Sequence, residues 1–369
     1  LAHSRAAVVR TTSRPQNSLA KTADVTAWTL LPGNARRLGR DLLDVQPGIR
    51  EYTAAVPHNV LVPGDGTHFA VVSAGIARGY YLENLVDLDP APPHLHIGLY
   101  PAPVDALRAL AETTDRILVI EEGYPYLERM LRGVLPSRWT IEGRESGALP
   151  ADGELTPDLV RAAVGLPARP RPRIEIPDLP GRPPQLCQGC PHIDSYDAIN
   201  EALAGYGESV VTADIGCYTL GALPPYNTIE SCVCMGASIG MAKGASDAGL
   251  RPALAVIGDG TFLHSGVTGL MDAVAADTDM TLIILDNQTI AMTGKQPTIL
   301  PDTRLEPIIL GTGVDPAHLH FIDADARHHD EFVALLRQEI DHPGLSVIVA
   351  VRACVEHLKT ERRRARAER

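Results

Sequence analysis

The sequence has few aromatic residues, a deficit of basic ones and no long apolar run. Phe, Trp and Tyr make up 4% of the 369 residues, and no apolar segment reaches the roughly 20 residues that a membrane-spanning helix needs. The formal net charge of -12 argues against broad binding to nucleic acids or anionic membranes. The first residues lack the apolar core of a signal peptide. We therefore expect a cytoplasmic globular protein that binds neither nucleic acid nor membrane.

The most informative stretch is residues 253–296, ALAVIGDGTFLHSGVTGLMDAVAADTDMTLIILDNQTIAMTGKQ. Two short apolar runs, 254–257 and 281–285, have the length and β-branched content of buried parallel strands. Residues 263–276 between them have helical spacing. A right-handed crossover of this kind places Asp259 and Asn287 together at the carboxyl edge of a sheet, where open α/β sheets bind ligands.

The residue types at that edge indicate a diphosphate held through Mg²⁺. Asp259 and Asn287 offer hard oxygen donors of the kind that Mg²⁺ takes beside waters and phosphates. Gly260 lets a backbone N–H approach an anion at a helix start. An ordinary βαβ turn is the alternative. The tripeptide Gly-Asp-Gly is by itself weak evidence for such a site, because it also occurs at Gly64-Asp65-Gly66. There it precedes a strand-like run without a crossover and predicts a simple turn.

The rest of the chain reads as two α/β regions with a linker between them. A helix-compatible segment at 28–56 is expected to bridge domains, and alternating elements over 68–134 are typical of a small parallel α/β domain. The proline-rich residues 146–185 predict a semi-rigid extended linker. The predicted strands are 68–73, 95–99, 116–121, 209–213, 320–323 and 345–351, and the predicted helices are 77–86, 104–113, 124–134, 195–204, 237–248 and 330–340.

Six cysteines without a secretory context point to thiols or metal ligands rather than disulfides. Cys187 and Cys190 form a C-x-x-C turn, Cys217 follows the strand at 209–213, and Cys354 follows the last strand. Four such thiolates suit either zinc or a [4Fe–4S] cluster, and spacing does not choose between them. Unliganded buried thiols are the third possibility.

Three further features have competing interpretations. Glu121-Glu122 ends a predicted strand, and we interpret the pair as solvated partners of a helix dipole, with a functional role as the alternative. Cys232 and Cys234 stand at the start of a glycine-rich helix, where small packing residues suffice. The basic tail KTERRRARAER predicts a frayed helix, with docking of an acidic electron carrier as the sharper alternative.

Six motifs together carry a family resemblance: CQGCPHIDSYDAI, TADIGCYTLGALPPYNT, CMGASIGMAKG, GDGTFLHSGV, LDNQTIAMTGKQP and VRAC. With them the chain resembles the large subunits of indolepyruvate:ferredoxin oxidoreductases, within the thiamine diphosphate-dependent 2-oxoacid:ferredoxin oxidoreductases. The resemblance is dense over 187–354 and weaker over 68–135. It implies an α/β protein in which a thiamine diphosphate-binding fold, a parallel doubly wound sheet, follows a smaller transketolase C-terminal-like α/β domain.

The resemblance also implies a domain order, and the chain departs from the family in two respects. The strand-like residues 6–12 resemble the last strand of a pyrimidine-binding domain, so the glutamate that activates the cofactor in the family is expected to lie outside this chain. Nothing after Cys354 resembles the ferredoxin-like domain of many relatives. The implied parts are 1–23 (remnant), 24–145 (transketolase C-terminal-like), 146–185 (linker), 186–358 (thiamine diphosphate domain) and 359–369 (tail).

The resemblance assigns residues to cofactors. It implies Mg²⁺ on Asp259, Asn287 and the carbonyl of Thr289, and it favours a [4Fe–4S] cluster over zinc. His264 is the candidate catalytic residue, for polar contact with substrate or intermediate, and a helix-capping or core histidine is the alternative. The implied diphosphate-binding residues are Gly258, Asp259, Gly260, Asn287 and Thr289, and the implied cluster ligands are Cys187, Cys190, Cys217 and Cys354.

The implied activity is oxidative decarboxylation of aryl 2-oxoacids such as indolepyruvate, with coenzyme A taking the acyl group and ferredoxin taking the electrons. A small subunit and homodimerisation are the implied assembly. Two other functions are compatible with the residues. One is a non-oxidative thiamine diphosphate-dependent decarboxylase or synthase, and the other is a cofactor-binding fragment without catalysis.

Overall fold

The computed structural model describes residues 24–367 except 30, 135–137, 171–180, 182–183 and 301–303. The strand predicted at 6–12, the remnant 1–23 and part of the predicted linker lie outside these described residues. The chain divides into two compact units, residues 1–176 and 177–369. Within the described residues, none of the helices combines the length and the apolar character needed to cross a bilayer.

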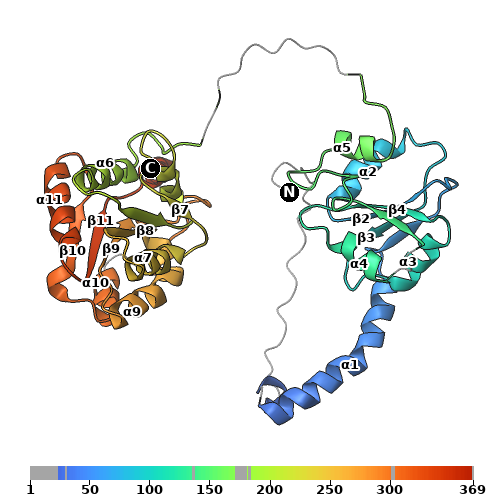
Figure 1. Cartoon of the computed structure of the whole chain (residues 1–369), viewed down its shortest axis with the longest axis horizontal. Helices are drawn as coiled ribbons and strands as arrows, with labels where there is room; N and C mark the ends of the chain where they lie inside the picture. Colours follow the sequence, from blue (N-terminus) through green and yellow to red (C-terminus); the bar gives the residue numbers. More distant parts are fainter. Residues whose placement is uncertain are drawn as a thin grey trace. The chain divides into compact units, whose positions relative to one another are not determined.

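The first unit is built on a five-stranded sheet in the order β1-β3-β2-β4-β5. Strand β1 pairs antiparallel with β3, and the other neighbours are parallel. Helices cover both faces (Figure 1), because one buried cluster uses Leu107 and Leu131 and the other uses Tyr81 and Val160. The strands are β1 Val60–Val62, β2 Ala70–Ala74, β3 His94–Ile97, β4 Arg116–Ile120 and β5 Thr140–Glu142, and the helices are α2 Ala77–Leu85, α3 Val104–Ala111, α4 Tyr126–Val134 and α5 Pro157–Ala163.

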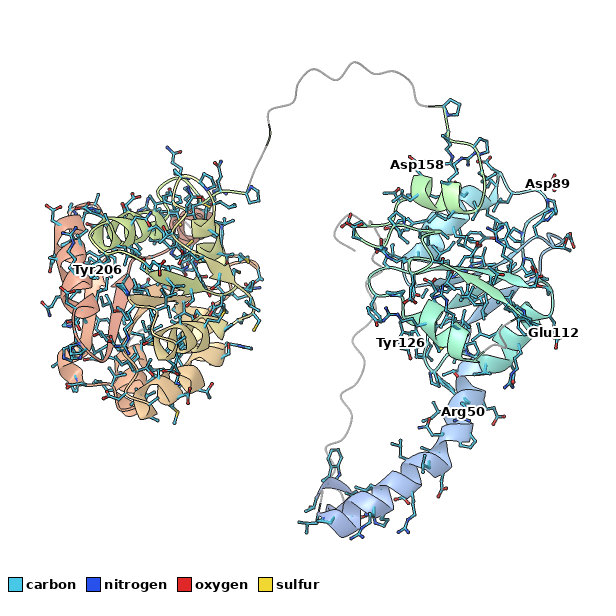
Figure 2. All side chains as sticks on the ribbon, viewed as in Figure 1. Arg50, Asp89, Glu112, Tyr126, Asp158 and Tyr206 are labelled. Atoms are coloured by element: carbon cyan, nitrogen blue, oxygen red, sulfur yellow. The ribbon has the colours of Figure 1, made fainter. Side chains whose placement is uncertain are left out.

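A long helix, α1 (Pro32–Ala55), precedes the first sheet and agrees with the predicted helical segment. Its buried residue is Thr53, and Figure 2 shows Arg50 among the side chains that extend from it. The second glycine–aspartate–glycine, Gly64 to Gly66, lies in a loop that no helix follows, as predicted.

The predicted linker differs from the structure at its start. Leu149, Leu155 and Val160 are buried in the core of the first unit, and α5 lies within the predicted linker range. Proline at the first position of α5 is compatible with a helix because that position needs no N–H donor. Proline in this range therefore marks a helix start at Pro157.

The second unit is a six-stranded parallel sheet in the order β10-β11-β9-β8-β6-β7. Helices α6 and α11 pack on one face, and α7, α9 and α10 lie on the other (Figure 1). The strands are β6 Val210–Ala213, β7 Ser231–Cys232, β8 Ala253–Gly258, β9 Met280–Asp286, β10 Leu319–Asp323 and β11 Leu345–Val351. The helices are α6 Pro191–Leu203, α7 Ala237–Asp247, α8 Asp259–Thr261, α9 Val267–Ala275, α10 Leu305–Gly311, α11 His329–Ile340 and α12 Val355–Ala367.

The helix predicted at 263–276 begins earlier in the structure. Helix α8 starts at Asp259, directly after β8, and continues through a π-helical turn, Phe262–Gly266, into α9. Apolar spacing missed this start because the first residues, Asp259 to Thr261, are polar or small and yet buried. Single π-helical turns inside helices are frequent at functional sites.

Candidate active site at the carboxyl edge of the second sheet

The carboxyl ends of β8 and β9 bring Asp259 and Asn287 to one edge of the sheet. The two strands pair in parallel, with Gly258 opposite Leu285. Every residue of both strands is buried, which explains their continuous apolar sequence. Asp259 and Asn287 are themselves 3% and 6% exposed. The structure therefore places two polar oxygen-bearing side chains in a largely dry environment at the edge that the sequence predicted.

The loop after β9 is held by short-range hydrogen bonds. The side-chain oxygen of Asn287 accepts from the backbone N–H of Thr289 (3.1 Å), and the Thr289 hydroxyl donates to the carbonyl of Gln296 (3.0 Å). Gln288 between them has a positive φ of 64°, a conformation that non-glycine residues seldom adopt. These contacts fix the backbone around the Thr289 carbonyl, which is the third predicted Mg²⁺ ligand.

We call the predicted Mg²⁺-diphosphate site the cradle; it consists of Gly258, Asp259, Gly260, Asn287 and Thr289. Two of its glycines have no room for a side chain. A Cβ on Gly258 would lie 2.7 Å from Cε1 of Tyr218, and a Cβ on Gly260 would lie 2.9 Å from Cγ1 of Ile290. A cavity of about 110 Å³ opens here and is lined in part by Asp259, Asn287 and Thr289. The donor set of carboxylate, amide and carbonyl oxygens suits Mg²⁺, and the close-packed glycines let backbone N–H groups approach a diphosphate.

Asp214 is a buried carboxylate beside the cavity that the sequence did not single out. It is fully buried and accepts hydrogen bonds from the Ser238 hydroxyl (2.8 Å), the Gly236 N–H (3.0 Å) and the Tyr218 hydroxyl. Burial raises the pKa of Asp214, and these hydrogen bonds partly oppose the rise. The network fixes Tyr218, which lines the cavity. An acidic residue directly after an apolar strand was the available signal.

The C-x-x-C pair forms a tight turn before α6. The N–H of Cys190 donates to the carbonyl of Cys187 (2.9 Å), and Gly189 has a φ of 76°. A glycine at the third position allows this left-handed turn geometry. Both thiols therefore lie close together at the start of the second unit.

All four predicted cluster cysteines line one cavity of about 140 Å³. Cys190 and Cys354 are buried, Cys217 is half-buried and Cys187 is exposed. Burial raises the pKa of the Cys190 thiol to about 12, and the other three thiols add to the rise. Burial likewise raises the pKa of Cys217. Such thiols become good ligands when a cation offsets their charge.

The spacing of the sulfurs bears on which metal centre fits. Thiolates around one tetrahedral Zn²⁺ lie about 3.8 Å apart, because each Zn–S bond is about 2.3 Å long. In the part of the chain that the structure describes, no three of these sulfurs lie within 4.8 Å of one another. The described cysteines therefore do not have three sulfurs at the spacing of a single tetrahedral Zn²⁺.

His192 connects the cysteine cavity to the cradle and was not singled out from the sequence. Its Nε2 accepts from the Asn287 side-chain amide (3.3 Å), and its ring meets Tyr218 edge-on. Burial lowers the pKa of His192 to about 4, so the ring is neutral. Cys217, Asn287 and Ala291 line both cavities. The signal available in the sequence was the position of His192, which follows Cys190 and Pro191 directly.

Two predictions near the cradle fare differently. His264 lies in the π-helical turn and is exposed, and it does not line the cradle cavity, so neither a core nor a cavity-facing role is visible within this unit. Cys232 and Cys234 are exposed, and the prediction that they are packing residues is therefore wrong. Strand β7 is an edge strand of two residues, so its side chains have few neighbours to bury them.

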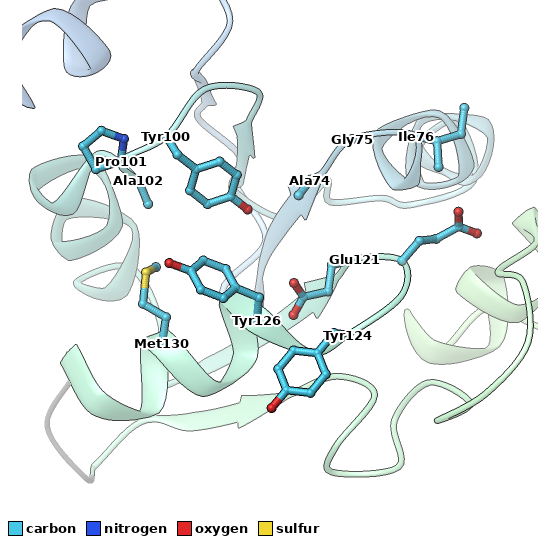
Figure 3. Close-up of a pocket in the computed structure, with 11 residues that line it drawn as sticks. Ala74, Gly75, Ile76, Tyr100, Pro101, Ala102, Glu121, Tyr124, Tyr126 and Met130 are labelled. Atoms are coloured by element: carbon cyan, nitrogen blue, oxygen red, sulfur yellow. The ribbon is translucent and has the colours of Figure 1, made fainter. Parts of the chain in front are cut away.

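A further cavity, about 760 Å³, lies in the first unit at the carboxyl ends of β2 and β4. Figure 3 shows Tyr100, Tyr126 and Glu121 around it. Glu121 is 5% exposed and accepts from the N–H groups of Leu127 and Glu128. Its predicted solvated role is therefore wrong, although its predicted partnership with a helix start is present. This cavity is larger than the one beside Asp259 and Asn287, and none of the cysteines lines it.

Comparison with known proteins agrees with this geometry. Residues 214–350 match the model of the thiamine pyrophosphate enzyme C-terminal TPP binding domain. Indolepyruvate oxidoreductase subunit IorA of Archaeoglobus fulgidus is 30% identical over 360 residues, covering 91% of this chain and 56% of that protein. The subunit of the same name from Methanothermobacter thermautotrophicus is 32% identical over 349 residues, covering 88% and 56%. The chain thus spans about half the length of these curated relatives.

Solved structures give weaker likenesses. 2-Oxoglutarate:ferredoxin oxidoreductase from Magnetococcus marinus has a TM-score of 0.39 at 16% identity, covering 50% of this chain and 74% of that one. Thiamine diphosphate-dependent 4-hydroxybenzoylformate decarboxylase from Rhodococcus jostii has a TM-score of 0.35 at 16% identity, covering 88% and 68%. These scores are too low to carry a functional argument. The matched domain, the parallel second sheet and the mostly parallel first sheet confirm the predicted fold class, and the curated relatives confirm the predicted resemblance.

Proposed function

This chain is a relative of the indolepyruvate oxidoreductase subunits IorA and contains a thiamine pyrophosphate-binding domain, and we propose that it serves a thiamine diphosphate-dependent 2-oxoacid:ferredoxin oxidoreductase. The substrates are aryl 2-oxoacids of the indolepyruvate kind, with coenzyme A as acyl acceptor and ferredoxin as electron acceptor. One observation carries the proposal. Four cysteines from three chain segments line one cavity that shares Cys217, Asn287 and Ala291 with the cradle.

In this proposal the residues of the cradle hold the cofactor's diphosphate. Asp259, Asn287 and the carbonyl of Thr289 bind Mg²⁺, and the close-packed Gly258 and Gly260 admit the phosphate oxygens. When bound there, thiamine diphosphate would supply a ring carbanion as the nucleophile for the substrate ketone and a cationic ring as the sink for the electron pair left behind when CO₂ departs. The buried Asp214 hydrogen-bonds Tyr218 beside the cavity and so fixes its wall.

The cysteine cavity supplies the route for electrons. We assign Cys187, Cys190, Cys217 and Cys354 as ligands of a [4Fe–4S] cluster, which accepts electrons one at a time. His192 stays neutral and holds the Asn287 amide between the two cavities. Cys187 is exposed, so a cluster held by these four residues would be accessible at this cysteine to an electron acceptor such as ferredoxin.

The enzyme in this proposal is an assembly in which the chain has protein partners. A small subunit and a second copy of the chain complete the assembly. The first sheet with its helices through α5 forms the transketolase C-terminal-like domain, residues 186–358 hold the cofactor, and the tail 359–369 is helical in its described part. His264 is exposed in this unit and therefore contacts substrate only if another part of the enzyme covers it.

Iron and acid-labile sulfide contents of anaerobically purified protein test the proposal. We expect about four of each per chain, with a broad visible absorbance that Cys354→Ser abolishes. Cys232→Ser is the matched control, because Cys232 is exposed and does not line the cysteine cavity. A colourless, iron-free protein that still binds thiamine diphosphate would overturn the oxidoreductase assignment in favour of a non-oxidative decarboxylase. Failure to bind the cofactor at all would favour a fragment without catalysis.

A further inference from the structure

A second group of metal-ligating side chains lies at the opposite edge of the sheet from the cradle. His318 ends the short 3₁₀ helix before β10, and His320 is the second residue of that strand. Glu339 lies at the end of α11, and Ser346 is the second residue of β11. Because all strands of this sheet are parallel, these residues gather at its amino edge, away from the cysteines. The two histidines are two positions apart and so project to the same side.

The Glu339 carboxylate is the centre of this group. Its Oε2 lies 2.8 Å from Nδ1 of His318, and its Oε1 lies 2.8 Å from Nε2 of His320. One ligand atom from each of the three side chains lies within 4.8 Å of the other two. Each carboxylate oxygen thus faces a different imidazole, and the three side chains converge on one point.

The environment of the group suits a bound cation. The Glu339 side chain is 0% exposed, whereas those of His318 and His320 are 24% and 26% exposed. Among the described residues, the ion pairs of Glu339 are those with these two histidines, and no lysine or arginine takes part. A buried carboxylate is costly unless positive charge or a full set of donors compensates it. The half-exposed imidazoles leave a path for an ion from solvent.

Neighbouring side chains hold the three groups in place. The Ser346 hydroxyl donates to Oε2 of Glu339 (2.7 Å), and the Gln338 amide donates to Oε1 (2.9 Å). The ring of His342 stacks on His318 at 3.4 Å and 14°, so it fixes that ring by its face rather than by a nitrogen. Metal-binding carboxylates and imidazoles are typically oriented by such outer contacts.

We propose that His318, His320 and Glu339 bind a divalent transition-metal ion of the Zn²⁺ kind, which ties the edge strand β10 to α11. Two imidazole nitrogens and one carboxylate suit Zn²⁺, Co²⁺ or Ni²⁺, whereas Mg²⁺ and Ca²⁺ prefer oxygen ligands alone. The site is separate from the cradle and the cysteines, and it does not depend on the proposed function.

Binding requires only a small rearrangement. Ligand atoms around a tetrahedral Zn²⁺ lie roughly 3.4 Å apart, so each 2.8 Å contact opens by about half an ångström. Each imidazole binds the ion through the nitrogen that now faces Glu339, and its proton moves to the other ring nitrogen. Water completes the coordination from the exposed side.

Calorimetric titration of the full chain with Zn²⁺, in excess Mg²⁺, tests this site. We expect wild type to bind one more equivalent of Zn²⁺ than His320→Gln, since the cysteines bind equally in both. His329→Gln is the matched control, because His329 lies on α11 and pairs with Glu201 at 2.8 Å but belongs to no such group. An equal stoichiometry in wild type and His320→Gln overturns the proposal, as does an equal loss in His329→Gln, which indicates nonspecific surface histidines.

Two further measurements keep the test decisive if His320→Gln does not fold. Ser346→Ala retains all three ligands and is expected to weaken Zn²⁺ binding about 10- to 100-fold through loss of carboxylate orientation. Co²⁺ in place of Zn²⁺ should give weak visible bands without the strong thiolate charge-transfer absorbance for this equivalent. Unchanged affinity in Ser346→Ala, or thiolate absorbance for every equivalent bound, contradicts the assignment.

Discussion

The backbone N–H of Cys354 donates a 3.0 Å hydrogen bond to the carbonyl oxygen of Asn287. One residue belongs to the cysteine cavity and the other to the cradle, and they come from the ends of the neighbouring strands β11 and β9. The pairing of Val351 with Asp286 sets this register. The two sites are thus close because β11 and β9 are neighbours in the sheet, although Cys354 and Asn287 are far apart in the sequence. A shift of either strand end would move both sites.

The cradle aspartate should be required for Mg²⁺-dependent binding of thiamine diphosphate. Asp259→Asn removes the anionic oxygen ligand while keeping the side-chain shape, and we expect the Kd measured by calorimetry to rise at least tenfold, or about 1.4 kcal/mol. Asp65→Asn is the matched control, because Asp65 lies in the other glycine–aspartate–glycine, exposed and without a following helix. Equal effects of the two substitutions would remove the reason for placing Mg²⁺ at Asp259.

A methyl group at Gly260 should disturb the cradle. Gly260→Ala places a Cβ 2.9 Å from Cγ1 of Ile290, and overpacking of this kind costs about 1–3 kcal/mol of unfolding free energy. Gly240→Ala is the control, since Gly240 lies in α7 and a Cβ added there would have no neighbouring atom within 4 Å, and it should gain about 0.5–1 kcal/mol. Denaturant unfolding measures both. The added substitution Ile290→Ala should relieve the strain, and a Gly260→Ala protein as stable as wild type would contradict the close contact.

The sequence predicted the elements that carry the cradle because their signals are local. Strands β8 and β9 are apolar throughout, and Asp259 and Asn287 follow them directly, so parallel pairing was enough to bring the two residues together. The four cysteines converge for the same reason, since Cys217 and Cys354 follow strands of the same sheet. Strand ends in a parallel sheet can be placed without knowing any side-chain contact.

What the sequence did not predict depends on contacts between distant segments. Apart from Tyr218, four positions from Asp214, the hydrogen-bond partners of the Asp214 and His192 side chains lie 22 to 95 positions away, and no periodicity marks these two residues. In the sequence Glu339 is an ordinary polar residue of α11, and only the fold brings Ser346, His318 and His320 around its carboxylate. The short strands β1, β5 and β7 have too few residues for an alternating pattern.

Glu121 should stabilise the first unit by capping α4. Its carboxylate accepts from the N–H groups of Leu127 (2.9 Å) and Glu128 (3.0 Å), which otherwise have no partner within the helix. Glu121→Ala is expected to lower the unfolding free energy by about 1–2 kcal/mol, measured by denaturant unfolding. Glu112→Ala is the control because Glu112 is exposed after α3, and it should change stability by less than about 0.5 kcal/mol. Equal losses in both proteins would contradict the capping role.

The buried His94 should make the first unit less stable in mild acid. Burial, with smaller contributions from His96 and Arg78, lowers the pKa of His94 to about 4 from an ordinary 6.5. Its ring lies against Tyr81, and its Nε2 is 2.8 Å from the Ser73 hydroxyl. Between these pH values the unfolded chain takes up a proton that the folded chain refuses. Stability is therefore complete above about pH 6.5 and falls toward pH 4, by up to about 3 kcal/mol.

Urea unfolding at several pH values, followed by fluorescence, measures this dependence in the first unit. Trp139 is partly buried in that unit's core, and Trp28, the other tryptophan, is 80% exposed, so the signal reports the first unit. His94→Gln should reduce the loss of stability between pH 6.5 and 4, whatever it costs at higher pH, because the neutral amide takes up no proton. His68→Gln, at an exposed position, should keep the wild-type dependence. A wild-type slope in His94→Gln would show that another group titrates in this range.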